Sequence, residues 1–420
     1  MYQVTRLKNG LMVATAEMPH MASVSLGLWV GVGGRHEPKE LSGVSHFIEH
    51  MLFKGTRRRS TNEISEAVEG IGGYLNAFTS EEISCFYAKA RHDRFDDLLD
   101  VLTDMSLNSV FDPKEIAKER GVIKEELAMY LDQPHQHVHE LLNETLWPNH
   151  PLGRSLTGTE ETLDALGRRQ MLNYQDENYV SAVTAIVAAG NVRHDRVVKA
   201  VGRYAARFSQ GRRPNFVPFA APQDAPRVRM HAKETAQMQM ALGIRTCSRH
   251  DERRYALRVL NTILGENMSS RLFQVLREDH GLAYSIHSGL SFFDDVGTLT
   301  ISAGLDTDKL QRTLKLTMRE LRRCTEELPS ASEMRRARDY LIGQLELSLE
   351  GTENQMNWVG EQLLAYGRII LPSEARKCIA EVKPGQVRAV AREFFRPERM
   401  NLAVVSPLKR ADGLVRILGG

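Results

Sequence analysis

Three ionisable side chains, His46, Glu49 and His50, stand within the otherwise apolar segment SHFIEHMLFKG at residues 45–55. Burying a charged or unpaired polar group costs several kcal/mol unless the group has a partner. The segment therefore indicates that something pairs with these side chains. Two histidines alone would more often be ordinary core residues, so the interpretation depends on the neighbouring glutamate and on a further ligand.

The segment is expected to be helical over residues 44–54, with Ser42 or Ser45 as its cap and Gly55 at its end. Residues four apart share one face of a helix, so the two imidazoles project together and the carboxylate lies beside them. Two imidazoles one turn apart can bind Zn²⁺. The order His-x-x-Glu-His, the inverted form of a common zinc motif, adds a carboxylate that can act as a base.

Candidates for the third ligand lie in a helix expected over residues 113–131. With about 3.6 residues per turn, Glu119 and Glu126 lie together on the flank of an apolar stripe, whereas Glu125 points to the solvent side. The stripe consists of Ile116, Ile123, Leu127 and Leu131. Helix geometry therefore favours Glu119 or Glu126 over Glu125 and does not choose between the first two.

The length of 420 residues predicts two domains of about 200 residues each. A stretch rich in Pro, Gly and Arg at residues 211–226 predicts a linker between a first domain at 1–210 and a second at 227–420. An alternating apolar strand followed by a polar turn occurs at residues 23–38 and again at 237–252. We therefore expect an α+β fold with two homologous α+β domains, in which helices cover one face of each sheet.

The duplication provides a comparison within one chain. When the repeats are aligned, Glu119 lies opposite Ala337 and Glu126 lies opposite Gln344. The segment opposite the histidine pair, RVLNTILGEN at residues 258–267, contains no histidine. The fold evidently does not need these charges, which favours a functional interpretation of them.

The composition argues against several classes of protein. The net charge of +2 gives no support for a nucleic-acid surface. No apolar run approaches the roughly 18 residues that span a bilayer, so no membrane span is expected. The first residues predict a strand, an Asn-Gly turn and a strand rather than a secretory signal or presequence, which makes a cytoplasmic location the expectation. The four cysteines, expected to be buried free thiols, are Cys85, Cys247, Cys324 and Cys378.

Four segments, GVSHFIEHMLFKGT, GGYLNAFTS, ERGVIKEEL and HPLGRSLTGTEETL, resemble the pitrilysin/insulinase-type inverzincin metallopeptidases. The likeness is greatest to the mitochondrial-processing-peptidase-like branch, with single-chain subunits of the bacterial type, and it extends over essentially the whole chain. The resemblance implies a zinc-dependent endopeptidase with one Zn²⁺ per chain. It implies the ligands His46, His50 and Glu126, with Glu49 as general base and Glu119 supporting the ligands from outside.

The resemblance also implies roles outside the histidine segment. Arg277 and Tyr284, which flank a glycine in LREDHGLAYSIHSG, would stabilise the oxyanion, although Tyr284 by composition alone would more often be a packing residue. Asn76, Ala77 and Phe78 would line an edge strand to which peptide adds, although an ordinary paired strand is an equal alternative. The family builds a closed chamber from two chains, which implies a clam-shell half-chamber and a homodimer, or a pair with a paralogous chain.

A non-enzymatic function is the alternative, namely a peptide-binding or assembly subunit that retains a zinc site. Glu49 argues against it, because a structural metal site needs no base and usually has four protein ligands.

Overall fold

The computed structural model describes residues 2–410 and 412–419, and the chain divides into two compact units. The first unit lies within Met1–Leu127, Arg154–Val217 and Leu347–Ile370, and the second within Ala128–Gly153, Pro218–Glu346 and Leu371–Gly420. Residues 128–153 thus belong to the second unit although they precede the expected linker, and residues 347–370 belong to the first although they follow it. The continuous domains expected at 1–210 and 227–420 therefore do not describe how these two segments pack.

The first unit contains a six-stranded sheet in the order β1-β2-β6-β3-β5-β4, in which only β2 and β6 run parallel. Its strands are β1 (Tyr2–Arg6), β2 (Met12–Glu17), β3 (Ser23–Val30), β4 (Tyr74–Thr79), β5 (Ser84–Arg91) and β6 (Thr184–Gly190). In β3, alternate residues point to opposite faces, so that Leu26 and Leu28 enter one hydrophobic core and Trp29 enters another. β4 forms one edge of the sheet.

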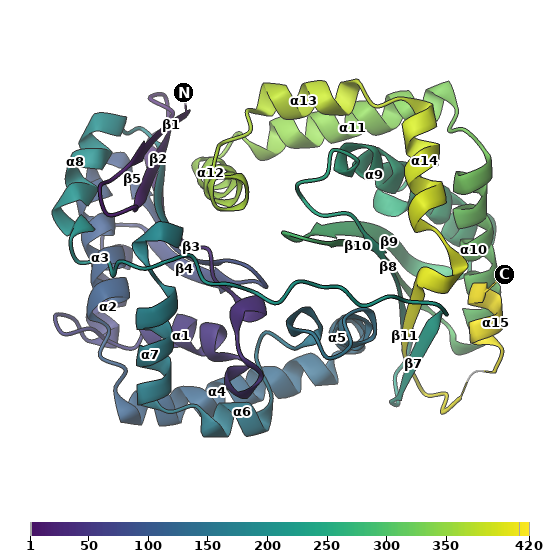
Figure 1. Ribbon diagram of the computed structural model, residues 1–420, viewed down its shortest axis with the longest axis horizontal. Coiled ribbons are helices and arrows are strands. Elements are labelled where there is room, and N and C mark those ends of the chain that lie inside the picture. Colours follow the sequence, from purple (N-terminus) through teal and green to yellow (C-terminus); the bar gives the residue numbers. More distant parts are fainter. Residues whose placement is uncertain (1, 411, 420) are drawn as a thin grey trace. The chain divides into compact units, whose positions relative to one another are not determined.

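Helices cover both faces of this sheet, where the sequence predicted one covered face. α1, α3 and α8 pack on one face, and α12 packs across β2, β3 and β6 on the other (Figure 1). Gly360 of α12 approaches Trp29 so closely that a Cβ there would lie 2.3 Å from the indole ring. The helices are α1 (Val44–Leu52), α2 (Thr61–Glu69), α3 (Phe95–Asn108), α4 (Pro113–Asp132), α6 (Glu160–Ala165), α7 (Arg168–Asn178), α8 (His194–Ala205) and α12 (Thr352–Tyr366).

The second unit contains a five-stranded sheet in the order β7-β11-β8-β10-β9, with β7 and β11 parallel. Its strands are β7 (Arg227–Ala232), β8 (Met238–Thr246), β9 (Ala283–Phe292), β10 (Gly297–Leu305) and β11 (Met400–Ser406). α9, α10 and α14 pack on one face, and α5 packs across β8 and β11 on the other. The helices are α5 (Pro134–Leu146), α9 (Arg254–Asn261), α10 (Leu310–Glu326), α11 (Ala331–Ser348), α13 (Pro372–Ala380), α14 (Pro384–Phe394) and α15 (Leu414–Gly419). Two π-helical segments, Thr262–Glu266 and Phe273–Asp279, lie between α9 and β9.

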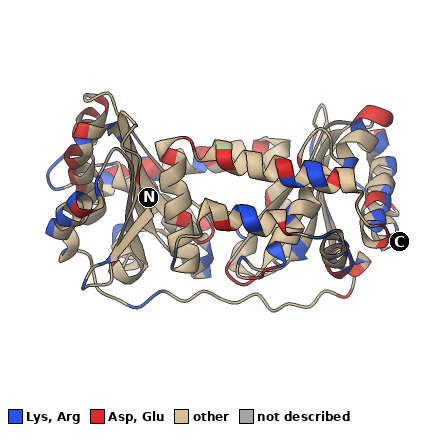
Figure 2. Ribbon diagram, turned by 90° about the horizontal axis from the view of Figure 1, so that it is seen from above, with Lys and Arg blue, Asp and Glu red and all other residues tan. Residues whose placement is uncertain are grey.

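The surface and the thiols largely match the composition. Figure 2 shows basic and acidic residues interspersed along the helices of each unit, in agreement with the net charge of +2. Within the described residues, none of the helices combines the length and the apolar character that crossing a membrane requires. All four cysteines are free thiols, and three are buried, but Cys378 is only half-buried.

Candidate metal centre

α1, which carries the histidine pair, begins as the sequence predicted but is capped by a different residue. Gly43, just before the helix, has φ +91°, which glycine adopts without strain. The first N–H groups of a helix lack partners within it. The buried Glu37 carboxylate accepts the N–H of Gly43 at 2.7 Å and that of Ser45 at 2.8 Å, so the expected cap by the Ser42 or Ser45 hydroxyl is wrong. Burial raises the pKa of Glu37 to about 7, although these hydrogen bonds oppose the shift.

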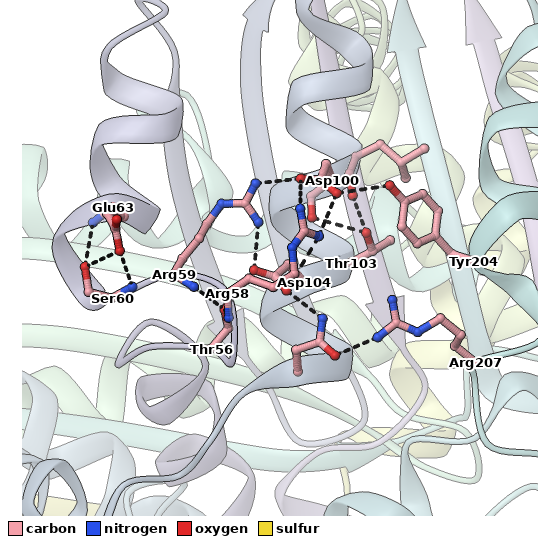
Figure 3. A network of polar contacts seen from close by, with 12 residues as sticks. Thr56, Arg58, Arg59, Ser60, Glu63, Asp100, Thr103, Asp104, Tyr204 and Arg207 are labelled. Atoms are coloured by element: carbon pink, nitrogen blue, oxygen red, sulfur yellow. Dashed lines mark hydrogen bonds and ion pairs between the residues drawn. The ribbon is translucent and has the colours of Figure 1, made fainter.

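The chain that follows α1 is fixed to α3 by a polar network (Figure 3). The Thr56 hydroxyl donates to the fully buried Asp104 carboxylate at 2.8 Å, and Arg59 pairs with the same carboxylate at 2.7 Å. Arg58 and Arg59 also share Asp100. Because a buried carboxylate is costly unless it is paired, these contacts specify one position for the segment, so both ends of α1 are held.

The structure brings His46, His50 and Glu126 together. One ligand atom from each lies within 4.8 Å of the others. The Nε2 atoms of His46 and His50 lie 3.6 Å and 3.7 Å from the Glu126 carboxylate. Two ligands of a tetrahedral zinc ion, each about 2.0–2.1 Å from the metal, are about 3.3 Å apart. These spacings, together with two imidazoles and one carboxylate as donors, fit a Zn²⁺ ion.

The structure separates the glutamates that helix geometry left open. Glu119 is buried, and its carboxylate lies 3.1 Å from Nδ1 of His50, on the other side of the ring from Glu126. Glu125 is exposed, as helix geometry predicted. The apolar stripe of α4 is shorter than expected, because Leu131 near the end of the helix is 40% exposed.

Glu49 lies next to the ligand set. Burial raises the pKa of its carboxyl group, a hydrogen bond from Thr79 and the nearby His50 lower it, and Glu126 raises it. One carboxylate oxygen, Oε2, is buried and has no hydrogen-bond partner among the described residues. A partly unsatisfied carboxylate with a raised pKa is the kind of group that accepts a proton during a reaction.

The residues expected to bind peptide lie on β4. Among the strands of the described chain, β4 pairs with β5 alone, and α1 packs beside it. Asn76 is exposed, whereas Ala77 and Phe78 are half-buried, and Phe78 meets Trp29 edge to face at 5.7 Å. An unpaired strand edge can accept an added strand. The binding role of these residues stays a prediction.

Arg277 and Tyr284 are neighbours in the second unit. Arg277 lies in the π-helical segment Phe273–Asp279, where the sequence predicted the end of an ordinary helix. Tyr284 lies near the start of β9 and is 73% exposed, and the guanidinium of Arg277 lies 5.8 Å from its ring centre. So exposed a side chain contributes little to packing, which weakens the packing alternative. Their role at the metal centre stays a prediction.

Three residues that contact α1 or the carboxylates beside it escaped the sequence analysis. They are the helix-capping Glu37, Thr79 beside Glu49, and Lys54, whose ammonium group lies 2.8 Å from Glu119. Lys54 had a signal, because it stands one helical turn after His50. Glu37 and Thr79 approach α1 from other segments, so no local pattern marks them.

Comparisons with known proteins identify the family to which the chain is related. Residues 12–160 match the family model "Insulinase (Peptidase family M16)", and residues 165–341 match "Peptidase M16 inactive domain". An uncharacterized zinc protease of Streptomyces coelicolor is 38% identical over 411 residues, covering 96% of this chain and 89% of its own. The uncharacterized zinc protease YmxG of Bacillus subtilis is 37% identical over 401 residues, covering 95% of this chain and 97% of its own.

Solved structures support the same fold. A protease from Helicobacter pylori matches with a TM-score of 0.91 at 20% identity, over 97% of this chain and 99% of that one. A structure from Pseudomonas fluorescens titled as a peptidase M16 inactive domain matches with a TM-score of 0.90 at 17% identity, over 97% and 98%. Given the family models and the full-length relatives, the chain belongs to the insulinase family of peptidases, M16.

Proposed function

We propose that this chain is a zinc-dependent endopeptidase that hydrolyses peptides or unfolded segments within an enclosed chamber. The observation that carries the proposal is the convergence of two imidazole nitrogens and one carboxylate oxygen within 4.8 Å, with Glu49 beside them. The names of the full-length relatives, each an uncharacterized zinc protease, support the same activity.

His46, His50 and Glu126 would hold one zinc ion per chain, which leaves a position open for substrate or water. When bound, the ion supplies a Lewis acid that polarises the scissile carbonyl and makes water a better nucleophile. Glu49 accepts the proton of the attacking water and later passes it to the leaving amine. The Thr79 hydroxyl beside Glu49 lowers the pKa of this carboxyl group and so favours its ionised, proton-accepting form.

Other residues bind the peptide and stabilise charge in this proposal. Asn76, Ala77 and Phe78 on the edge strand β4 hold the peptide as an added strand, through backbone hydrogen bonds more than side chains. Arg277 and Tyr284 donate to the oxyanion that forms at the scissile carbonyl. Two copies of the chain, or this chain with a paralogous one, form the chamber.

A non-catalytic subunit that retains zinc is the second candidate, and Glu49 is the residue that argues against it. A subunit that only binds peptide has no use for a buried carboxylate with an unsatisfied oxygen beside the metal ligands.

The test is hydrolysis of a quenched fluorescent, unstructured peptide by the intact chain. We expect cleavage that a chelator abolishes and that added zinc restores. Glu49→Gln should bind zinc as the wild type does and lose turnover. The control is Glu40→Gln, at an exposed glutamate shortly before α1, which should cleave the peptide normally. Zinc binding without any cleavage by the wild type would favour the non-catalytic subunit.

A further inference from the structure

We propose that Lys54 is a positioning residue of the metal centre, which holds Glu119 so that His50 presents its Nε2 atom, and not Nδ1, to the zinc ion. This inference rests on the proposed zinc binding. It concerns how one ligand is oriented and assigns a function to a lysine outside the ligand set.

The contacts form a relay of three side chains. Lys54 Nζ lies 2.8 Å from Oε1 of Glu119, and Oε2 of the same carboxylate lies 3.1 Å from Nδ1 of His50. Each carboxylate oxygen thus has its own partner, which fixes the plane and rotation of the group. Nε2 of His50 then faces Glu126 at 3.7 Å.

The relay also accounts for a buried charge. The side chain of Glu119 is only 3% exposed, and a carboxylate in such a place needs a cation or several hydrogen bonds. His50 is neutral when it binds a metal, so it cannot balance the charge. Among the described residues, Lys54 is the cation that contacts Glu119.

An ionised carboxylate only accepts hydrogen bonds. The His50 nitrogen that faces Glu119 is therefore the protonated one, and the lone pair lies on Nε2. His46 differs, because its Nδ1 atom is buried without a partner among the described residues. Of the two histidine ligands, His50 is the one whose orientation depends on a charged relay, so a change at Lys54 acts on the metal through His50 alone.

The experiment measures zinc affinity of the intact chain by competition with a fluorescent chelator. Lys54→Met should weaken zinc binding by up to the about 10-fold to 100-fold that loss of an outer partner of a ligand costs, because Lys54 holds that partner, Glu119, in place. Lys54→Arg should recover most of the affinity. The control is Lys124→Met, which removes a lysine of α4 that pairs with Asp164 at 2.7 Å and not with a residue of the metal centre. The zinc affinity of this variant should equal that of the wild type. Equal affinity of Lys54→Met and wild type would overturn the proposal.

A double-mutant cycle tests the route through Glu119. If Lys54 acts on the metal through this carboxylate, Lys54→Met should add no further loss to Glu119→Gln. Additive losses would contradict the relay and indicate that Lys54 acts through general stability of the end of α1.

A readout without metal separates this inference from the proposed function. In apo protein with ¹⁵N-labelled histidine, recorded at a pH high enough for the His50 ring to be neutral, we expect the His50 signal of the wild type to be that of the Nδ1-protonated tautomer, and that of Lys54→Met to be a mixture. The same tautomer in both proteins would overturn the inference even if the wild type binds zinc. Failure of the wild type to bind zinc would instead overturn the proposed function.

Discussion

Apart from the additional edge strand β1 of the first unit, the two sheets have corresponding strand orders, but the units differ where the first carries its cluster of ionisable residues. In α4, Glu119 lies six residues after the first residue, Pro113, and Ala337 lies six residues after Ala331, the first residue of α11. Both positions are buried, at 2% and 3% exposure. The same site in the repeat therefore holds a carboxylate in one unit and a methyl group in the other.

The region opposite the histidine pair shows how the same fold is built without these histidines. In the second unit, Thr262, Ile263, Asn267 and Ala337 help to line a cavity of about 20 Å³, which is room for about one water molecule. The lining of this cavity contains no histidine, and its glutamate, Glu333, is paired with Arg271 at 2.7 Å. The second unit therefore keeps its sheet and core without a counterpart of the histidine pair. The charges of the first unit are therefore not required by the architecture, and a function must account for their cost.

The largest effect, a fall in kcat, is expected for Tyr284→Phe. This substitution tests whether the second unit contributes to the chemistry. The loss of one oxyanion donor should lower kcat by about 10² to 10³ and leave zinc content unchanged. Tyr340→Phe in α11 is the control and should leave kcat unchanged. Peptide turnover and metal content of the two variants decide the question, and a normal kcat for Tyr284→Phe would make the second unit a scaffold.

Glu126→Gln should weaken zinc binding by about 100-fold or more, since a ligand contributes at least as much as an outer partner. Glu125→Gln, its exposed neighbour on the same helix, should bind zinc like the wild type. Chelator competition on both variants measures the difference. A loss of zinc affinity with Glu125→Gln and none with Glu126→Gln would contradict the ligand set. It would also remove the functional difference proposed between Glu126 and Gln344, the aligned residue of the second unit.

Gly360→Ala tests whether α12 belongs to the first unit. Its Cβ would lie 2.3 Å from the ring of the fully buried Trp29, and such overpacking lowers the free energy of unfolding by about 1–3 kcal/mol.

The control for this substitution is Gly343→Ala in α11, where a Cβ meets nothing within 4 Å. It should raise the free energy of unfolding by about 0.5–1 kcal/mol through helix propensity. Urea denaturation followed by tryptophan fluorescence measures both. A free energy of unfolding for Gly360→Ala that equals or exceeds that of the wild type would contradict the packing of α12 on this sheet.

The smallest effect is expected for the loss of folding stability at low pH, which should be similar in the two units. Burial opposes ionisation of Asp100, but hydrogen bonds from Arg58 and Arg59 outweigh it and lower its pKa to about 2 from an ordinary 3.8. Glu333 of the second unit behaves alike, because burial is outweighed mainly by Arg271 and its pKa falls to about 2.

A folded-state pKa below the ordinary value means that the stabilisation is present above the ordinary pKa and is lost as pH falls through the folded-state value. The stability advantage of the wild type over Asp100→Asn, and over Glu333→Gln, should therefore be constant above about pH 5 and shrink toward pH 2. Urea denaturation at several pH values measures it. An advantage that grows as pH falls would contradict both ion pairs.

Local periodicity accounts for what the sequence predicted well. The α1 helix and the exposure of Glu125 follow from residue spacing within one turn or two. The choice between Glu119 and Glu126 does not, because both lie on one flank of α4. Only the packing of α4 against α1 directs one of them to Nε2 of His50 and the other to Nδ1.

Non-local packing accounts for what the sequence missed. The apolar faces of α5 and α12 predict that each helix is buried, but not against which sheet. Each covers a sheet built mainly from the opposite half of the chain. The cap of α1 by Glu37 was missed for the same reason, since nearby serines are the usual capping residues and the carboxylate reaches the helix from an upstream loop.

The central claim is that one metal site exists per chain and that the first unit alone provides it. Elemental analysis of the purified intact chain, after exposure to zinc and removal of excess metal, tests this claim directly. The account predicts one zinc per wild-type chain and none in the His46→Ala/His50→Ala double variant, with the folded state of the variant verified by circular dichroism. One zinc per chain in the double variant, or none in the wild type, would contradict it.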